Sequence, residues 1–201
     1  MTRVAVLDRV GYVREDRFVP PSDPLNDVAG GPNCGDNNNM DTQVRTPQMV
    51  FLQPQRFVVP LFQRPYVWNK ENQWEPLWND IVRLTDKVIR RPGDKHYPHF
   101  LGAVVLQQVQ MQTGQMQERT VIDGQQRLTT PQLFLDALHA ELLFVEALTP
   151  ALRIEPLVRN GAPFCQKPED QFKVWPTNRD RPAFNAIMSA KPPVDYDALE
   201  E

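Results

Sequence analysis

The chain has 201 residues, 41% of them hydrophobic and 23% charged, so it is long enough for one domain with a real core. Its net charge of -3 argues against a protein that coats nucleic acid through bulk electrostatics. The same charge is compatible with a local basic pocket. Cys34 and Cys165 make neither a zinc spacing nor a disulfide framework, and no run of about 18 apolar residues predicts a membrane span. We therefore expect a cytoplasmic protein.

The first 44 residues are poor in side chains that pack. After a short apolar alternation from Val4 to Leu7, the segment is rich in proline, glycine and asparagine, which favour turns and linkers. The sequence predicts a flexible N-terminal arm over residues 1–44, with room for one short strand. The foldable domain is expected over 45–190.

Aromatic residues surround a Gln-Arg pair after the first predicted strand of the domain, at 56–60. Pro65 disfavours helical geometry at Arg64, so the segment should be a rigid, extended loop. Arg64 could add a cation to a phosphate site, with Gln63 beside it. Tyr66 and Trp68 could stack on a base, or the aromatics could simply close the core.

Asn69 is a suitable N-cap for a helix over about 70–90, although Pro76 predicts that the regular helix begins only near Glu75. Its apolar residues recur at steps of three, four and seven, which is one face of an amphipathic helix. This face includes Trp74 and Trp78, which we expect in the core.

The region after this helix predicts an antiparallel hairpin, with strands at 99–107 and 118–122 and a polar link between them. A long helix should follow over about 127–148, with Pro131 tolerated in its first turn and Pro150 ending it. Further prolines predict short pieces beyond: a strand at 172–175 and a helix at 181–190. Residues 191–201 are expected to be a frayed tail or a truncation point.

A strand, a tight turn and a helix start meet at residues 121–130, Val-Ile-Asp-Gly-Gln-Gln-Arg-Leu-Thr-Thr. Gly124 is the residue there that can take a positive φ or let another group approach the backbone. Unpaired N–H groups at the helix start, beside Arg127, would make a cradle for phosphate. Alternatively, Asp123 and Gly124 form an ordinary turn, and Arg127 pairs with a surface carboxylate.

The sequence resembles the N-terminal domain of GmrSD-type modification-dependent restriction systems, a family of bacterial phage-defence proteins. The resemblance covers about 45–190 and is carried by five segments: 59–68, the Trp-rich helix that ends at 79–81, 99–102, 122–130 and 172–180. It implies an α+β fold of the ParB/sulfiredoxin-like kind, a small mixed sheet with flanking helices. It also implies that the Asp-Gly-Gln-Gln-Arg turn binds and hydrolyses GTP or another NTP.

If the turn hydrolyses an NTP, the needs of phosphoryl transfer suggest roles for individual residues. Asp123 would hold Mg²⁺, Gln125 or Gln126 would orient water, and Arg127 would hold phosphate oxygens. The nucleotide-binding set expected around these four catalytic residues is Gln63, Arg64, Gly124, Thr129 and Thr130.

Such domains are usually joined to a C-terminal HNH nuclease that cuts modified phage DNA, so an HNH domain or subunit and modified DNA are the expected partners. The three scattered histidines of this chain cannot make an HNH site. Two rival hypotheses stay open. In one, the same pocket recognises modified DNA and hydrolyses nothing; in the other, the domain is a structural adaptor.

Overall fold

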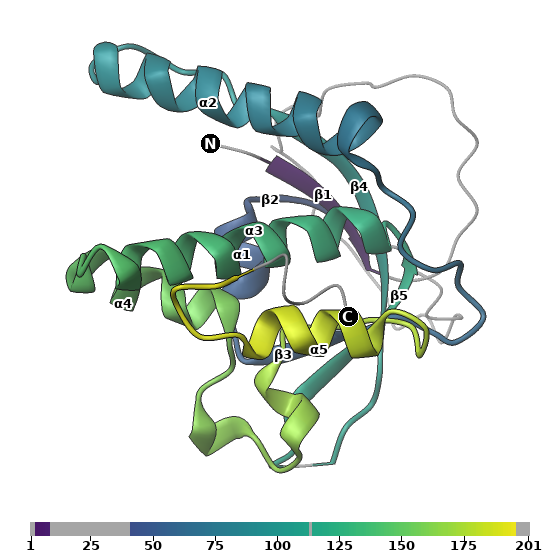
Figure 1. Ribbon diagram of the computed structural model, residues 1–201. Helices are drawn as coiled ribbons and strands as arrows, with labels where there is room; N and C mark the ends of the chain where they lie inside the picture. Colours follow the sequence, from purple (N-terminus) through teal and green to yellow (C-terminus); the bar gives the residue numbers. More distant parts are fainter. Residues whose placement is uncertain (1–2, 9–40, 113, 196–201) are drawn as a thin grey trace, which may run out of the picture.

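A mixed sheet runs through the domain in the computed structural model, which describes residues 3–8, 41–112 and 114–195 (Figure 1). Within these residues the strand order is β2-β1-β4-β5-β3-β6. The strands are β1 (Arg3–Asp8), β2 (Asp41–Arg45), β3 (Gln55–Val58), β4 (Phe100–Gln108), β5 (Gln117–Asp123) and β6 (Val174–Trp175). The β1–β2 and β4–β5 pairs are antiparallel, whereas β1–β4, β3–β5 and β3–β6 are parallel. The predicted α+β class with a small mixed sheet is confirmed.

The structure describes only part of the predicted N-terminal arm. Its two ends contribute β1 and β2, and β1 lies between β2 and β4 in the sheet. Residues 9–40, where the arm's linker-like sequence falls, lie outside the described residues, as do 196–201 of the predicted tail.

The helices are α1 (Pro47–Phe51), α2 (Glu75–Arg90), α3 (Gln125–Phe144), α4 (Leu148–Val158) and α5 (Arg181–Ser189). A π-helical turn, η1 (Lys70–Trp74), precedes α2, and two short 3-10 segments, η2 (Ala162–Phe164) and η3 (Pro168–Gln171), precede β6. Helix α3 packs against β4 and β6, and α4 and α5 lie beside it (Figure 1).

The predicted hairpin is confirmed: β4 and β5 pair in antiparallel register, with Leu106 opposite Val121. The main cluster of buried residues joins this hairpin to β3, α1 and the start of α3; its members are Val50, Phe51, Phe57, Val59, Val104, Leu106, Val121, Leu128 and Val174. Burial of such side chains contributes roughly 1.5–3 kcal/mol each. The core therefore lies directly beneath the end of β5 and fixes the position from which Asp123 emerges.

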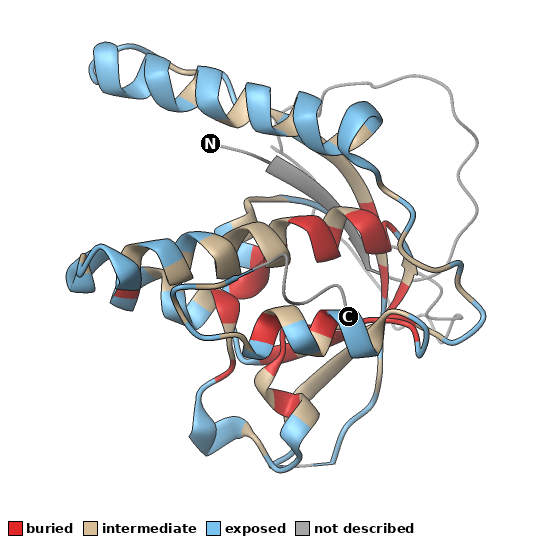
Figure 2. Ribbon diagram, viewed as in Figure 1, coloured by how far each residue is buried: buried red, intermediate tan, exposed pale blue. Residues whose placement is uncertain are grey.

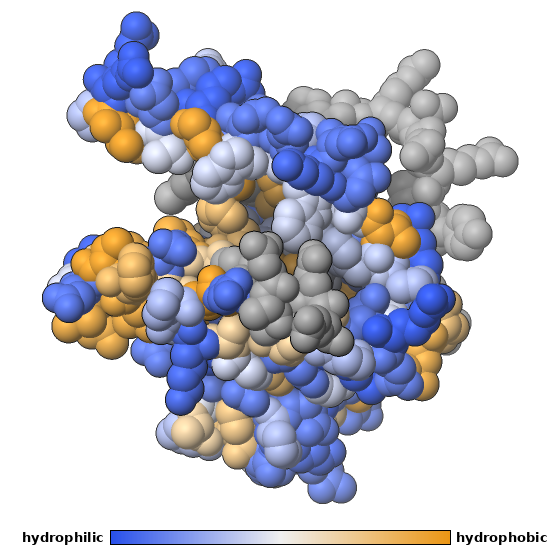
Figure 3. Space-filling model, in the orientation of Figure 1, coloured by the Kyte–Doolittle hydropathy of each residue, from blue (hydrophilic) through white to orange (hydrophobic). Residues whose placement is uncertain are grey.

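Helix α2 begins as predicted but does not bury its apolar face. The Asn69 side chain caps the turn that leads into it, accepting from the backbone N–H of Asn72 at 2.9 Å. Trp74 and Trp78, expected in the core, are 42% and 53% exposed, and no described residue of α2 is buried (Figure 2). The helix stands away from the sheet, and its apolar side faces a hollow of about 390 Å³ between α2 and α3 (Figure 3). The helix has the apolar face that the periodicity predicted, but periodicity alone does not show whether another element covers that face.

Two proline-based predictions were wrong. Helix α3 starts at Gln125, two residues earlier than expected, so Pro131 lies inside the helix beyond its first turn. Pro150 does not end a helix; it sits in the first turn of α4, which the sequence analysis missed. A first-turn proline costs little because its missing N–H would have no partner there. Helices α3 and α4 are instead separated at Glu146, which has a φ of +58°.

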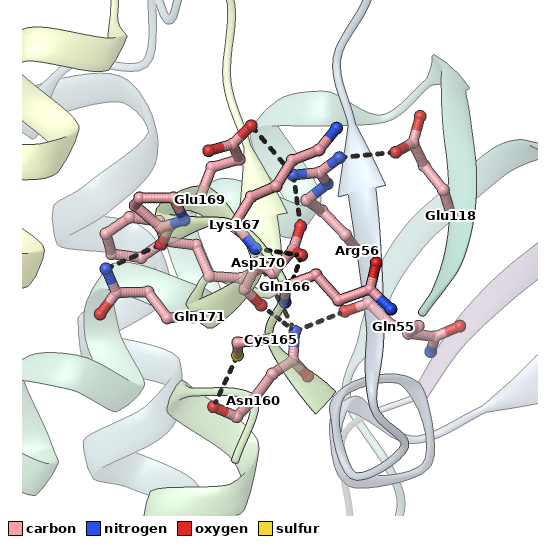
Figure 4. Close-up of polar contacts among 12 residues, drawn as sticks. Gln55, Arg56, Glu118, Asn160, Cys165, Gln166, Lys167, Glu169, Asp170 and Gln171 are labelled. Carbon is pink, nitrogen blue, oxygen red and sulfur yellow. Dashed lines mark hydrogen bonds and ion pairs between the residues drawn. The ribbon is translucent and has the colours of Figure 1, made fainter. Parts of the chain in front are cut away.

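A polar network fixes the segment before β6 to strands β3 and β5 (Figure 4). Arg56 on β3 contacts Glu118 on β5 at 2.7 Å and Asp170 on η3 at 2.9 Å. Asn160 donates to the backbone oxygens of Gln55 at 3.1 Å and Asp170 at 2.8 Å. Because Arg56 and Asp170 are largely buried, losing one partner would leave an uncompensated charge. The network therefore holds η3 against β3 and β5.

Because Lys173 is buried, we expect the free energy of unfolding to depend on pH. Its side chain is 1% exposed, and its Nζ donates to the Gln53 carbonyl oxygen at 3.0 Å. Burial lowers the pKa of Lys173 from 10.5 to about 8. Between these pH values the unfolded chain binds more protons than the folded one, so stability should rise with pH, by at most about 3 kcal/mol.

The measurement is the free energy of unfolding in urea at pH 7 and pH 10, for the wild type and Lys173→Met. The variant lacks the titrating group, so the gain from pH 7 to pH 10 should be larger in the wild type. Equal gains in the two proteins would contradict the prediction.

Candidate functional site

The turn between β5 and α3 has the backbone geometry that the sequence predicted. Gly124 has a φ of +89° and precedes the first residue of α3. A Cβ atom at this position would lie 2.9 Å from Val104 Cγ2 and 3.0 Å from the Ala103 carbonyl oxygen. Glycine is therefore required twice, for the left-handed backbone and for the close approach to β4. The turn places the N-terminal end of α3 directly after Asp123, where the first N–H groups of a helix have no partner within the helix.

Arg127 lies across a second glycine, on the neighbouring strand. Gly102 has a φ of +103°, and a Cβ there would come within 2.5 Å of Arg127 Nε. Arg127 Nη1 donates to the Ala103 carbonyl oxygen at 3.0 Å and lies 3.9 Å from Asp123 Oδ2. Both contacts use one terminal nitrogen of a guanidinium that carries five N–H donors, so others stay available for an anion. The pairing with a surface carboxylate considered above is only this loose contact within the motif.

The two glutamines of the motif bind the Arg64–Val67 loop. Gln125 Nε2 donates to the Arg64 carbonyl oxygen, and Gln126 Nε2 donates to that of Pro65 at 3.3 Å. Gln126 Oε1 accepts from the backbone N–H of Val67 at 3.2 Å, so both ends of its amide are engaged. In the other direction, Gln63 Nε2 donates to the Ile122 carbonyl oxygen at 2.7 Å. Gln125 and Gln126 are buried, and their geometry supports a positioning role; orienting water stays a prediction.

Tyr66 joins this loop to α3 and to the turn before α2. Its hydroxyl lies 2.6 Å from Thr130 Oγ1 and accepts from Trp74 Nε1 at 2.8 Å. The Tyr66 and Trp74 rings pack edge to face, with centroids 6.2 Å apart, and burial raises the pKa of Tyr66. These contacts engage Tyr66 with the protein itself, and its predicted stacking on a base stays untested.

Replacing Tyr66 with phenylalanine should destabilise the domain by about 1–2 kcal/mol, because the indole N–H of Trp74 and the hydroxyl of Thr130 both lose their partner. Thermal unfolding measures the change. Tyr97→Phe is the matched control, since Tyr97 is 79% exposed and should give no shift. Equal stability of the two variants would show that the Tyr66 hydroxyl contributes nothing.

A small pocket of about 130 Å³ lies where the turn and the loop meet. It is lined by Gln63, Arg64, Trp68, Asp123, Gly124, Gln125, Gln126 and Arg127. Eight of the eleven predicted site residues thus come together, and the two arginines, 63 positions apart in the sequence, line one pocket. Tyr66, Thr129 and Thr130 are not part of this lining, and the two threonines are each only 6% exposed.

The charges at the pocket favour an anion. Two arginines and the N-terminal end of a 20-residue helix face a single carboxylate, Asp123, whose side chain is 73% exposed. Within the described part of the chain, no group of three or more His, Cys, Asp or Glu side chains could hold a metal ion by itself. A cation here would therefore share Asp123 with a bound ligand.

Two supporting residues were missed by the sequence analysis. Gly102 forms the seat beneath Arg127, and a glycine inside a strand pattern is a known sign of close backbone approach. Asp180 accepts from the backbone N–H of Tyr66 at 3.0 Å and from the Thr177 hydroxyl at 2.7 Å. Nothing local in the sequence indicates the contact of Asp180 with a loop 114 positions away.

The fold and the site together define an α+β domain that carries a polar, arginine-lined pocket at a strand–turn–helix junction. Residues 48–201 match the sequence profile of the family described as GmrSD restriction endonuclease, N-terminal domain. The chain belongs to this family. No curated protein sequence matches it.

In the part of the chain that the structure describes, no helix has both the length and the apolar character needed to cross a membrane.

Proposed function

We propose that this chain is the nucleotide-binding and hydrolysing sensor domain of a cytoplasmic, modification-dependent restriction system. The observation that carries the proposal is the pocket that Arg64, Arg127 and the N-terminal end of α3 line together. Phosphoryl transfer depends on positioning and charge stabilisation more than on a covalent nucleophile, and this set of groups supplies both. The proposed partners are modified phage DNA and an HNH nuclease domain or subunit.

The size of the pocket indicates which part of a nucleotide would enter. Whole drug-sized ligands occupy sites of about 300–1,000 Å³, whereas this pocket measures about 130 Å³. It suits the terminal phosphates of GTP or another NTP, with the nucleoside outside along Trp68. Arg127 would hold the oxygens of the transferred phosphoryl group, and Arg64 would close over it from the opposite segment.

Mg²⁺ suits this donor set. Mg²⁺ in phosphoryl-transfer sites is commonly held by one or two carboxylates, water and the substrate phosphates, and Asp123 supplies one carboxylate. Bound there, the ion would neutralise part of the phosphate charge. The chain's own contribution is to hold the phosphate with Arg127 and Arg64, and to keep the loop in place through Gln125 and Gln126.

A non-catalytic reader of modified DNA is the second candidate. The same small volume accepts a single backbone phosphate, and the Trp68 ring at the pocket offers a surface for an unstacked base. In that case the pocket would bind DNA and release no phosphate from any NTP.

Phosphate release from GTP and ATP, with Mg²⁺ and with EDTA, tests the first candidate. We expect Mg²⁺-dependent release by the wild type and a rate at least about 10-fold lower for Asp123→Asn, since the variant keeps the shape but loses the charge. Asp94→Asn is the control, because Asp94 is an exposed carboxylate in the α2–β4 loop, outside the pocket lining.

Absence of release by the wild type with any NTP would reject hydrolysis and leave the DNA reader. Equal rates for wild type and Asp123→Asn would reject the role of Asp123 alone.

A further inference from the structure

A second charged surface lies at the far end of α2. The C-terminal half of α2 and the loop that follows it line a concavity of about 670 Å³. The cationic residues around this concavity are Arg83, Lys87, Arg90, Arg91 and Lys95. The segment 83–99 contains these five cations and two aspartates, which gives +3 within a chain of net charge -3. Positive charge is therefore concentrated here against the balance of the whole chain.

The anions of the segment do not cancel this charge. Asp86 pairs with Arg90 at 2.6 Å, Asp94 lies 3.8 Å from Arg91, and Asp80, just before the segment, pairs with Arg83 at 2.6 Å. Lys87 and Lys95 are exposed and have no ion pair among the described residues. Exposed pairs of this kind are weak, about 0–1 kcal/mol, so the arginines can exchange their partners for other anions.

The cations are arranged along one side of a helix. Arg83, Lys87 and Arg90 are spaced by four and three residues, which places them on one face over about 10 Å. Phosphates of one DNA strand repeat every ~3.4 Å of the duplex axis, so this row spans about three of them. The exposed ring of Tyr97, 79% accessible, lies at the same concavity.

We propose that the C-terminal half of α2 and the loop 91–99 form a contact surface for the sugar–phosphate backbone of duplex DNA. Helix α2 stands away from the sheet, and its outer side is mostly hydrophilic, so a duplex can approach it without displacing other elements (Figures 1 and 3). A restriction endonuclease acts on DNA, and this surface would let the domain contact DNA without using the arginine-lined pocket. The inference rests on the DNA-sensing part of the proposed function and is independent of nucleotide hydrolysis.

The test is the binding of a fluorescein-labelled duplex of roughly 20 base pairs, without modified bases, measured by anisotropy without nucleotide between about 50 and 200 mM NaCl. The surface variant is Lys87→Gln/Arg90→Gln/Lys95→Gln. The control, Arg153→Gln/Lys167→Gln/Lys191→Gln, removes the same charge from exposed positions elsewhere. Thermal unfolding of both variants checks that they are folded.

We expect the surface variant to bind at least about 10-fold more weakly, with a salt slope smaller by about two to three, because each lost phosphate contact removes about 0.9 from it. The control should stay within about twofold of the wild type. Equal losses in both variants would show an effect of net charge alone and would overturn the proposal. It would also be overturned by no DNA binding in the wild type, or by binding to phosphatidylserine vesicles instead of DNA.

Phosphate release separates this inference from the proposed hydrolysis. A surface variant that loses DNA binding but releases phosphate at the wild-type rate supports both. If the wild type binds DNA through this surface but hydrolyses no NTP, only the hydrolysis is rejected.

Discussion

Replacing Arg127 with alanine is expected to lower Mg²⁺-dependent phosphate release by at least about 100-fold. The Arg127 guanidinium lies against Gly102 and donates a hydrogen bond to the Ala103 carbonyl oxygen. It lines the same pocket as Arg64. A preorganised cationic donor aimed at developing phosphate charge typically contributes about 2.7–4 kcal/mol to the transition state. The measurement is single-turnover hydrolysis with saturating nucleotide, so that loss of binding and loss of rate are separated.

Two further variants sharpen this test. Arg127→Lys keeps the charge but loses the planar fork, and should fall between wild type and Arg127→Ala. Arg153→Ala removes an exposed arginine from α4 and should leave the rate unchanged. Hydrolysis by Arg127→Ala at the wild-type rate would remove Arg127 from the mechanism.

Gly102→Ala should also impair hydrolysis strongly, although residue 102 would touch no substrate. The added Cβ would come within 2.5 Å of Arg127 Nε and 2.9 Å of its Cδ, so the side chain must leave its seat. The positive φ adds roughly 1–2 kcal/mol of strain for alanine. We expect a loss of rate of about 10-fold or more and a clearly lower midpoint of thermal unfolding.

A double-mutant cycle identifies the cause. In the Arg127→Ala background the added methyl group meets no guanidinium, so Gly102→Ala should cost no further activity and only its backbone strain in stability. Additive losses of activity in the double variant would mean that Gly102 acts through something other than Arg127.

The sequence predicted best those elements whose cause is local. Asn69 as a cap, the hairpin before Asp123 and the left-handed Gly124 each depend on a few neighbouring residues, and all three are present. The predictions that failed required knowledge of distant surfaces. Trp74 and Trp78 have the spacing of a buried face, but whether a second surface covers that face cannot be read from α2 itself.

The same distinction holds at the pocket. The sequence placed Arg127 at a helix start from the turn, and it offered Arg64 as a second cation for the same phosphate site, but it gave no contact that joins the two segments. The hydrogen bonds that join the two segments run from buried glutamine amides to backbone carbonyl oxygens. Every residue has a backbone carbonyl, so the sequence does not show which one accepts. The hydrogen bonds from Gln125 and Gln126 to the loop were therefore not predicted, while both residues line the pocket and their role in orienting water stays a prediction.

The amide contact between Gln126 and Pro65 joins positions 61 residues apart. At about 5–20 residues per second, the ribosome makes the Arg64 segment roughly 3–12 seconds before its partner. During that interval no Asp-Gly-Gln-Gln-Arg turn exists to hold the early segment, so translation must pass the second arginine before a nucleotide could meet a finished binding site. Under the proposed function, newly made chains would hydrolyse nucleotide only after most of the domain has been synthesised.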